Sequence, residues 1–306
     1  MVSNSVINVK NLRKNYGDIE AVRGISFQVS KGEVFALLGP NGAGKTTTVE
    51  ILEGHRGSTA GEVVVLGHNP ALNEVSFKRR IGIVLQQTGV QPYLTVEETL
   101  KLFRGYYLRP RSVDDVIEAT GLETLRSIKV SKLSGGQQRR LDVAVGLIGN
   151  PELLFVDEPT TGFDPSARRA AWQMVKNLQT LGKTVFLTTH YMDEAEYLAD
   201  RVALMVNGQI IAEGSPADLA GKERFAIKFL LDKPLHNFPE TLSINERNKG
   251  GAYIIKTDTP EKALFDLTAW ALQEGISLQN LNVSKPSLEE IYLQIVDREE
   301  VEGNHK

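Results

Sequence analysis

The chain has 306 residues, a net charge of −3, 41% hydrophobic and 24% charged residues, and no cysteine. These values are typical of a soluble globular protein with one large domain or two, and they exclude disulfides, thiolate metal sites and cysteine nucleophiles. The charge balance does not suggest a nucleic-acid partner. The first residues do not predict a signal peptide, and the apolar runs are far shorter than the roughly 20 residues of a membrane helix. Any membrane step therefore needs another chain.

The first third of the chain predicts short strands and one helix. Residues 6–9 and 25–29 predict strands on either side of a turn at Asn15–Asp18. Within that turn, Tyr16 either packs on the core or serves as a stacking platform for a base. A helix is predicted to begin at Thr46, and further strands are predicted at 34–38, 61–67 and 81–85.

The middle of the chain predicts helices without intervening strands. One helix starts with the capping box Thr95–Glu98 and extends toward Tyr107, and a second is capped by Ser112 and stops at Gly121. A third follows Ser134 and ends at Asn150-Pro151. We therefore expect a helical subdomain, about residues 88–150, inserted into an α/β core.

After this insertion, strands and helices alternate again. Strands are predicted at 153–156, 184–189, 201–206 and 209–212, with helices at 166–181 and 192–198. Such alternation favours a mainly parallel sheet with helices on both faces, to which the N-terminal segments add antiparallel strands. The predicted fold class is α/β, and the first domain spans residues 1–221.

A stretch rich in turn residues, 214–223, separates this domain from a different pattern. Residues 222–306 predict a small α+β domain with a charged tail from 297 to 306. A helix should start at Thr259 and another at Ser287, and strands are predicted at 225–231, 243–246, 252–257 and 277–283.

The stretch from Gly39 to Thr47 indicates chemistry most strongly. It fits the pattern G-x-x-x-x-G-K-[ST] and lies between a predicted buried strand and a helix start. Backbone N–H groups converge on an anion at such a turn, and the helix dipole adds positive potential. We therefore expect this P-loop to bind phosphate through Gly39, Pro40, Asn41, Gly42, Ala43, Gly44, Lys45, Thr46 and Thr47.

Three other predicted strands end in reactive residues, namely Gln86, the pair Asp157 and Glu158, and His190. Carboxyl ends of parallel strands meet at one edge of a sheet, where ligands bind. Taken alone, an acidic pair after an apolar strand is more often a helix N-cap than a catalytic pair, a histidine there is more often structural, and a glutamine at a strand end usually has no role. Their occurrence together with a P-loop favours a site that hydrolyses a nucleoside triphosphate.

Each of these side chains has a chemical role that it can perform. Lys45 can neutralise charge on the β- and γ-phosphates, and Asp157 can hold Mg²⁺ beside the Thr46 hydroxyl. Glu158 can accept a proton from the water that attacks the γ-phosphate. His190 can hold the γ-phosphate. Gln86 can orient that water or touch the metal.

The segment Leu133-Ser-Gly-Gly-Gln137 suggests a second anion site at a helix start. One nucleotide does not need two helix N-termini from one chain, so this site could face a nucleotide on another subunit. The alternative is an N-cap with a flexible glycine pair. The residues concerned are Ser134, Gly135, Gly136 and Gln137.

Together these motifs resemble the ATP-binding-cassette (ABC) ATPases, over roughly residues 4–215. The resemblance covers the P-loop, Gln86 of the Q-loop, the signature Ser134–Gln137, Asp157 and Glu158, Asp164 of the D-loop, and the switch histidine His190. Tyr16 occupies the place where the family stacks an aromatic ring on adenine. Two departures are small, since Phe163 replaces the commoner Leu before Asp164, and Gln87 leaves the Q-loop register open by one residue.

This resemblance implies an ATPase in which two cassettes enclose two ATP molecules with Mg²⁺, as a homodimer or a heterodimer. It also implies a separately encoded transmembrane permease, no nucleic-acid partner, and a place on the cytoplasmic face of the cell membrane. The ending Pro286–Leu293 resembles the daunorubicin-resistance-type exporter ATPases, which suggests export of a drug, lipid or similar compound. The alternatives are a soluble ABC-type ATPase acting on nucleic acid or the ribosome, and a regulatory module that binds ATP without hydrolysis.

Overall fold

The computed structural model describes residues 5–84, 89–221, 225–233, 238–239, 242–247, 250–285 and 287–293. Gln86 and the predicted charged tail lie outside the described residues. The chain divides into two compact units, Met1–Pro216 and Ala217–Lys306, which are described separately. No helix within the described ranges is long and apolar enough to cross a membrane.

A six-stranded sheet forms the centre of the first unit, in the order β5-β6-β7-β3-β8-β9. Its pairs are parallel except for β8 and β9, whose hairpin turns at Asn207 and Gly208, both with positive φ, as the sequence predicts. Every residue of β3 and β7 is buried, which is typical of parallel strands covered on both faces. The strands are Val34–Leu38 (β3), Ile81–Val84 (β5), Leu153–Asp157 (β6), Thr184–Thr189 (β7), Arg201–Val206 (β8) and Gln209–Gly214 (β9).

A second, antiparallel sheet has the strand order β2-β1-β4. Its strands are Ser5–Tyr16 (β1), Ile19–Ser30 (β2) and Ala60–Val65 (β4). The predicted strands 6–9 and 25–29 are too short, because β1 and β2 pair along their whole length with several bulges. The predicted mainly parallel core with antiparallel N-terminal strands is confirmed.

The two sheets share one apolar core. A row of packed rings crosses it, with centroid distances of 5.4 Å from Phe27 to Phe35, 5.5 Å from Phe35 to Phe186 and 5.8 Å from Phe186 to Phe155. These rings belong to β2, β3, β7 and β6, so the row links the antiparallel sheet to the parallel one. Aromatic packing of this kind stabilises beyond the area that it buries.

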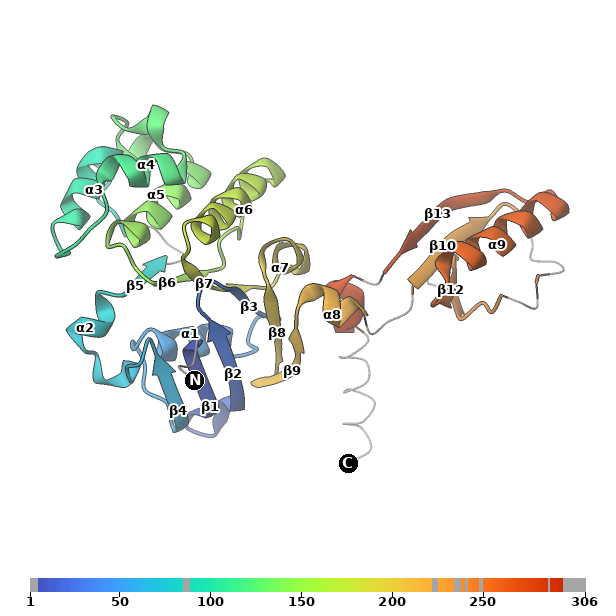
Figure 1. Ribbon diagram of the computed structural model, residues 1–306, viewed down its shortest axis with the longest axis horizontal. Coiled ribbons are helices and arrows are strands. Elements are labelled where there is room, and N and C mark those ends of the chain that lie inside the picture. The colour runs from blue at the N-terminus through green and yellow to red at the C-terminus, as the bar shows by residue number, and fades with distance from the viewer. Residues whose placement is uncertain are drawn as a thin grey trace. The chain divides into compact units, whose positions relative to one another are not determined.

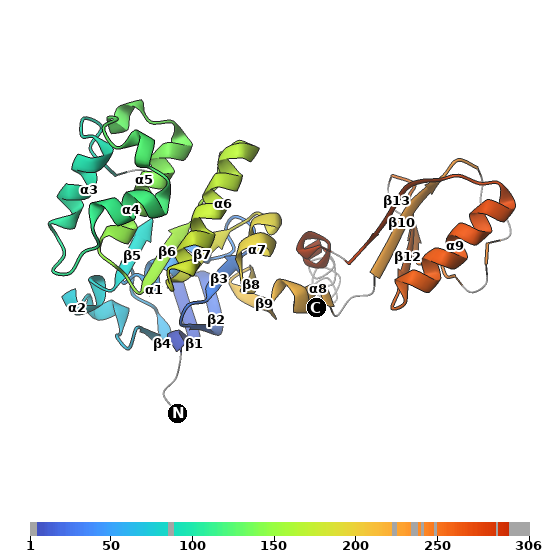
Figure 2. The ribbon, with the colours of Figure 1, turned by 45° about the horizontal axis from the view of Figure 1, so that its top comes forward.

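Along the described part of the chain, three α-helices follow β5 and precede β6. Both views show them grouped apart from β1, β2 and β4 (Figures 1 and 2). They are Val96–Arg104 (α3), Val113–Thr120 (α4) and Gly135–Ile148 (α5). The capping box of α3 is present, but the helix ends at Arg104 instead of continuing toward Tyr107, because tight turns follow Gly105. The other elements of this unit are Lys45–Leu52 (α1), Pro70–Leu72 (η1), Val75–Lys78 (α2), Glu123–Leu125 (η2), Val130–Lys132 (η3), Pro165–Thr180 (α6) and Met192–Leu198 (α7).

The second unit contains a four-stranded antiparallel sheet with the order β11-β12-β10-β13. Leu267 and Trp270 of its helix share an apolar cluster with Ile227 of β10. The strand predicted at 243–246 is wrong, since pairing with β12 covers only Glu246 and Arg247. The elements are Phe225–Leu231 (β10), Glu246–Arg247 (β11), Tyr253–Thr257 (β12), Pro260–Glu274 (α9) and Leu278–Ser284 (β13), with Pro216–Gly221 (α8) before them.

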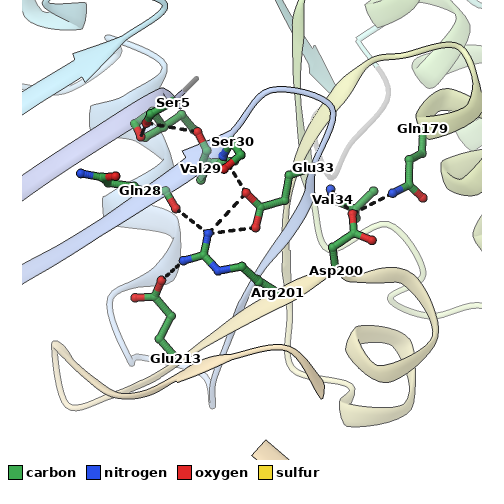
Figure 3. Close-up of polar contacts among 11 residues, drawn as sticks. Ser5, Gln28, Val29, Ser30, Glu33, Val34, Gln179, Asp200, Arg201 and Glu213 are labelled. Atoms are coloured by element: carbon green, nitrogen blue, oxygen red, sulfur yellow. Dashed lines mark hydrogen bonds and ion pairs between the residues drawn. The ribbon is translucent and has the colours of Figure 1, made fainter. Parts of the chain in front are cut away.

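A polar network at the start of β8 joins strands of both sheets (Figure 3). The Arg201 guanidinium donates to Glu33 Oε1 (3.0 Å) and to the Gln28 carbonyl (3.2 Å), and it forms an ion pair with Glu213. Glu33 is only 8% exposed and also accepts a bond from the Ser30 N–H. A buried carboxylate needs such partners, since an unpaired buried charge is costly.

We expect Arg201→Met to lower the free energy of unfolding of the first unit by about 1–3 kcal/mol, because Glu33 loses its cation. Urea unfolding would be followed through Trp172 fluorescence in a Trp270→Phe background, so that only this unit reports. The control is Arg13→Met, which removes an exposed ion pair with Glu20 and should cost under about 1 kcal/mol. Equal losses in the two variants would contradict a stabilising role for the network.

Candidate functional site

The P-loop follows β3, and its last three residues form the start of α1. Gly44 is the N-cap of α1 and has φ of 103°, a conformation that favours glycine. A Cβ at Gly39 would lie 2.1 Å from the Met205 carbonyl oxygen, so this position also accepts only glycine without a shift of the backbone. The loop therefore packs against β8 through positions where no side chain fits.

Lys45 lies across the P-loop and is almost fully buried. Its Nζ donates to the carbonyl oxygens of Gly39 (2.8 Å) and Pro40 (3.0 Å). Burial lowers the pKa of Lys45, and the charges of Glu158 and Asp157 oppose this shift. The lysine and both acids thus share one electrostatic environment.

The acidic pair at the end of β6 is held by the neighbouring strand β7. The Thr188 hydroxyl donates to Asp157 Oδ1, and its oxygen accepts from the Glu158 N–H at 3.2 Å. The same N–H donates to the Thr188 carbonyl at 3.1 Å. The role of Thr188 was not predicted from the sequence, although its place two residues before His190 on a predicted strand was a usable signal.

Glu158 and His190 lie in contact. His190 Nδ1 is 3.3 Å from Glu158 Oε1, and the Thr161 hydroxyl donates to Glu158 Oε2 at 2.9 Å. Glu158 has a φ of 43°, a strained conformation for this residue type. Both carboxylate oxygens of Glu158 are therefore oriented by neighbours, while part of the side chain remains open to solvent.

The ends of β3, β6 and β7 bring most of the predicted residues together. The Gly39 N–H donates to the carbonyl of Thr189, which precedes His190, at 3.3 Å. This contact joins the P-loop to the strand that carries the histidine. Gln86 lies outside the described residues, so its predicted place at the same edge stays a prediction.

Glu53 is a buried acid behind this edge that the sequence did not reveal. It follows α1 and is only 5% exposed. Burial raises the pKa of Glu53 to about 8, and the charges of Asp157 and Glu50 add to the effect. The raised pKa arises from packing across the core, which no local sequence pattern encodes.

The signature residues begin α5. The Ser134 N–H donates to Gln137 Oε1 (2.9 Å), and the Gln137 N–H donates to Ser134 Oγ (3.4 Å), so Ser134 is the N-cap of this helix. That the motif also faces a nucleotide on another subunit stays a prediction. Gly135 is exposed, and a Cβ at Gly136 would lie 3.4 Å from that of Ala167 in α6.

Further side-chain bonds fix the start of α6 and connect α5 to the site. Asp164 caps α6 through bonds from the N–H groups of Ser166 (2.8 Å) and Ala167 (3.0 Å). Arg139, which is 5% exposed, donates through Nη2 to the carbonyl of Asp157 at 2.7 Å. The helix that begins at Ser134 is thus bonded to the strand end that carries the acidic pair.

Tyr16 is exposed, so the interpretation that it packs on the core is wrong. Two cations lie over its ring, Lys14 Nζ at 5.2 Å and the Arg56 guanidinium at 5.3 Å from the ring centroid. Arg56 is fixed in turn by Glu50 of α1 at 2.6 Å. The aromatic ring is available at the surface beside the helix that follows the P-loop.

These features define a P-loop nucleoside-triphosphatase. The fold agrees with solved ATP-binding cassettes. One is cbiO1 from Clostridium perfringens, part of an ABC transporter complex, with a TM-score of 0.65 and 28% identity over 72% of this chain and 92% of that one. Another is a dimeric cassette in a post-hydrolysis state bound to ADP and Pi, with a TM-score of 0.60 and 28% identity over 68% of this chain and 98% of that one.

Sequence relatives extend this likeness to the whole chain. The ABC transporter family matches residues 22–161. A Nod factor export ATP-binding protein I of Rhizobium sp. (strain N33) is 36% identical over 97% of this chain and 99% of its own length. The linearmycin resistance ATP-binding protein LnrL of Bacillus subtilis (strain 168) is 33% identical over 96% and 99%.

The chain belongs to the ABC transporter family. It is an ATP-binding and ATP-hydrolysing subunit, and the relatives that match it over their full length are exporter-type ATPases. The comparisons do not favour the alternative of a soluble ATPase that acts on nucleic acid or the ribosome.

Proposed function

We propose that this chain powers export of a drug, lipid or similar compound through a separately encoded permease, as one of two cassettes that close around two ATP molecules. The names of the two full-length relatives, which concern Nod factor export and linearmycin resistance, support the export direction. The first unit is the nucleotide-binding domain, and the second is an accessory domain. The assembly lies on the cytoplasmic face of the cell membrane.

In this proposal, Glu158 accepts a proton from the water that attacks the γ-phosphate. Its carboxylate is suited to this role because Thr161 and His190 orient its two oxygens. His190 contacts the γ-phosphate, and Lys45 exchanges its loop carbonyls for the β- and γ-oxygens.

The residues near the P-loop also suit Mg²⁺, which prefers oxygen ligands and usually binds through one or two protein groups plus phosphates. The exposed Thr46, the Asp157 carboxylate and Gln86 would hold it. When bound, Mg²⁺ supplies positive charge that neutralises the phosphate oxygens. Thr188 keeps Asp157 in place through its hydroxyl.

The remaining assignments concern the nucleotide base and the second subunit. Tyr16 stacks on adenine, and Asp164 contributes to the boundary between the cassettes. Ser134–Gln137 of one cassette face the nucleotide of the other. The single observation that supports this composite site is the start of α5. Ser134 and Gly135 are exposed there, and the capping residues Ser134 and Gln137 bond to each other.

Glu158→Gln should lower kcat for ATP by at least about 100-fold, because an amide cannot accept the proton. ATP affinity should change by less than about threefold, since the P-loop contacts remain. Size-exclusion chromatography with ATP should show more dimer than for the unmodified protein. Glu62→Gln, which removes an exposed carboxylate of β4, serves as the control, and near-normal turnover of Glu158→Gln would remove Glu158 as the base.

Ser134→Arg should leave ATP binding by the monomer unchanged while it blocks dimerisation and turnover, because a long cation would fill the surface that faces the second nucleotide. Binding of a fluorescent ATP analogue and ATP-dependent dimerisation measure the two effects separately. Lys132→Arg, on the exposed segment just before the signature, is the control. Normal hydrolysis by Ser134→Arg would show that the signature is not part of the site.

The permease should dock on the exposed apolar side chains beside α3, namely Tyr93, Leu102, Tyr106 and Leu108. A neighbouring groove runs between α3 and the ends of α1 and β5, and is lined by Glu53, Lys78, Ile83, Phe103 and Tyr107.

Tyr106→Glu should therefore abolish co-purification with membranes from cells that co-express the permease. ATP hydrolysis by the isolated subunit should stay within about twofold, since Tyr106 lies outside the nucleotide site. Leu181→Glu places the same charge at another exposed apolar position and should leave membrane association intact. Retention of Tyr106→Glu on membranes would place the docking surface elsewhere.

A further inference from the structure

Glu194 is a buried acid to which the proposed mechanism gives no role. It lies on α7, four residues after His190, and its side chain has no exposed surface. Its Oε1 atom accepts hydrogen bonds from the Thr160 hydroxyl at 2.8 Å and from the Trp172 Nε1–H at 2.9 Å. One carboxylate oxygen thus binds two donors from different parts of the chain.

The two donors belong to the segments that carry the other site residues. Thr160 lies two residues after Glu158, and its neighbour Thr161 bonds to the Glu158 carboxylate. Trp172 belongs to α6, the helix that Asp164 caps. Glu194 itself follows the loop of His190, so its Oε1 atom joins three segments at one point.

The other oxygen of Glu194 shows that this position is unfavourable for an acid. Among the described residues, Oε2 is buried without a hydrogen-bond partner. Burial raises the pKa of Glu194, while the hydrogen bonds from Thr160 and Trp172 to Oε1 oppose the shift. A buried group with one unsatisfied atom calls for an explanation, and the three joined segments provide one.

A second set of contacts links the same segments on the outside of Glu194. The Arg168 guanidinium of α6 lies 4.4 Å from the centroid of the Tyr191 ring, which in turn lies 4.1 Å from that of His190. Arg168 also pairs with Asp193 at 3.2 Å. These contacts hold the Tyr191 ring beside His190, whereas Glu194 binds the Thr160 and Trp172 side chains.

We propose that Glu194 is a positioning residue of the ATPase, which keeps the segments of Glu158, His190 and Asp164 in the arrangement that hydrolysis needs. The inference rests on the proposed roles of Glu158 and His190. The positioning depends on the acceptor oxygen of Glu194 and not on its charge. A glutamine at this place, whose carbonyl oxygen can accept the same bonds, should therefore substitute for Glu194.

Glu194→Ala should lower kcat by about 10- to 100-fold, because a misplacement near 1 Å has that effect, while the Kd for ATP changes less than about threefold. Glu194→Gln should retain kcat within about threefold, since its amide oxygen accepts both bonds. Thr160→Val, which keeps the volume but removes one donor, should lower kcat by about three- to tenfold. Glu196→Ala removes an exposed carboxylate from the same helix and should leave kcat unchanged.

A readout without hydrolysis separates this inference from the proposed function. The protein has five histidines, so the imidazole NMR signals of ¹³C,¹⁵N-histidine-labelled protein can be resolved, and His190→Gln assigns the signal of His190. Glu194→Ala should shift that signal and leave those of His55 and His68 in place. If Glu158→Gln hydrolyses ATP normally but the His190 signal still shifts in Glu194→Ala, the catalytic assignment fails and the positioning stands.

Three results would overturn the inference. The first is a His190 signal that does not move in folded Glu194→Ala or in Thr160→Val. The second is Glu194→Gln with the same loss of kcat as Glu194→Ala, which would make the charge, and not the acceptor, responsible. The third is a loss of ATP affinity as large as the loss of kcat, which would indicate general damage to the site.

Discussion

The hydroxyl of Thr188 is the contact on which the arrangement of the site depends. It donates to the Asp157 carboxylate and accepts from the Glu158 N–H, across the parallel pair β6 and β7. These two bonds give the adjacent acids different surroundings. Asp157 is held at the strand end, while Glu158 turns with a positive φ toward Thr161 and His190. The Thr188 hydroxyl thereby helps to give the Asp157 carboxylate surroundings suited to binding a cation and the Glu158 carboxylate surroundings suited to accepting a proton.

The charged network that stabilises the fold and the charged residues of the nucleotide site lie at opposite ends of the parallel strands. The network of Glu33, Arg201 and Glu213 lies at the beginning of β3 and β8, and the P-loop lies at the carboxyl end of β3. Parallel strands make this division possible because all their carboxyl ends share one edge. The Phe27–Phe35–Phe186 row lies in the apolar core that the two sheets share.

Motifs fixed by the backbone were predictable from the sequence. Gly44 requires its glycine by conformation, the caps Thr95–Glu98 and Ser134–Gln137 follow a local rule, and the turn at Asn207 demands positive φ. The parallel core followed from the alternation of strands and helices.

Residues whose role arises from distant packing could not be predicted. Glu53 has its raised pKa because the core and Asp157 surround it, and Glu194 meets Thr160 and Trp172 only in the folded chain. The length of β1 was missed for the same reason, since pairing with β2 overrides its weak alternation.

The bond from Arg139 to the Asp157 carbonyl has a mechanical consequence. That carbonyl and the Glu158 N–H belong to one peptide group, which is planar and resists twisting. Arg139 of α5 donates a hydrogen bond to the oxygen of this peptide group, and Thr188 of β7 accepts one from its N–H. Ser134 and Arg139 are five residues apart on one helix, about 7.5 Å along its axis. A displacement of α5 relative to β7 must therefore either rotate the Asp157–Glu158 peptide group or break the hydrogen bond from Arg139 or the one to Thr188.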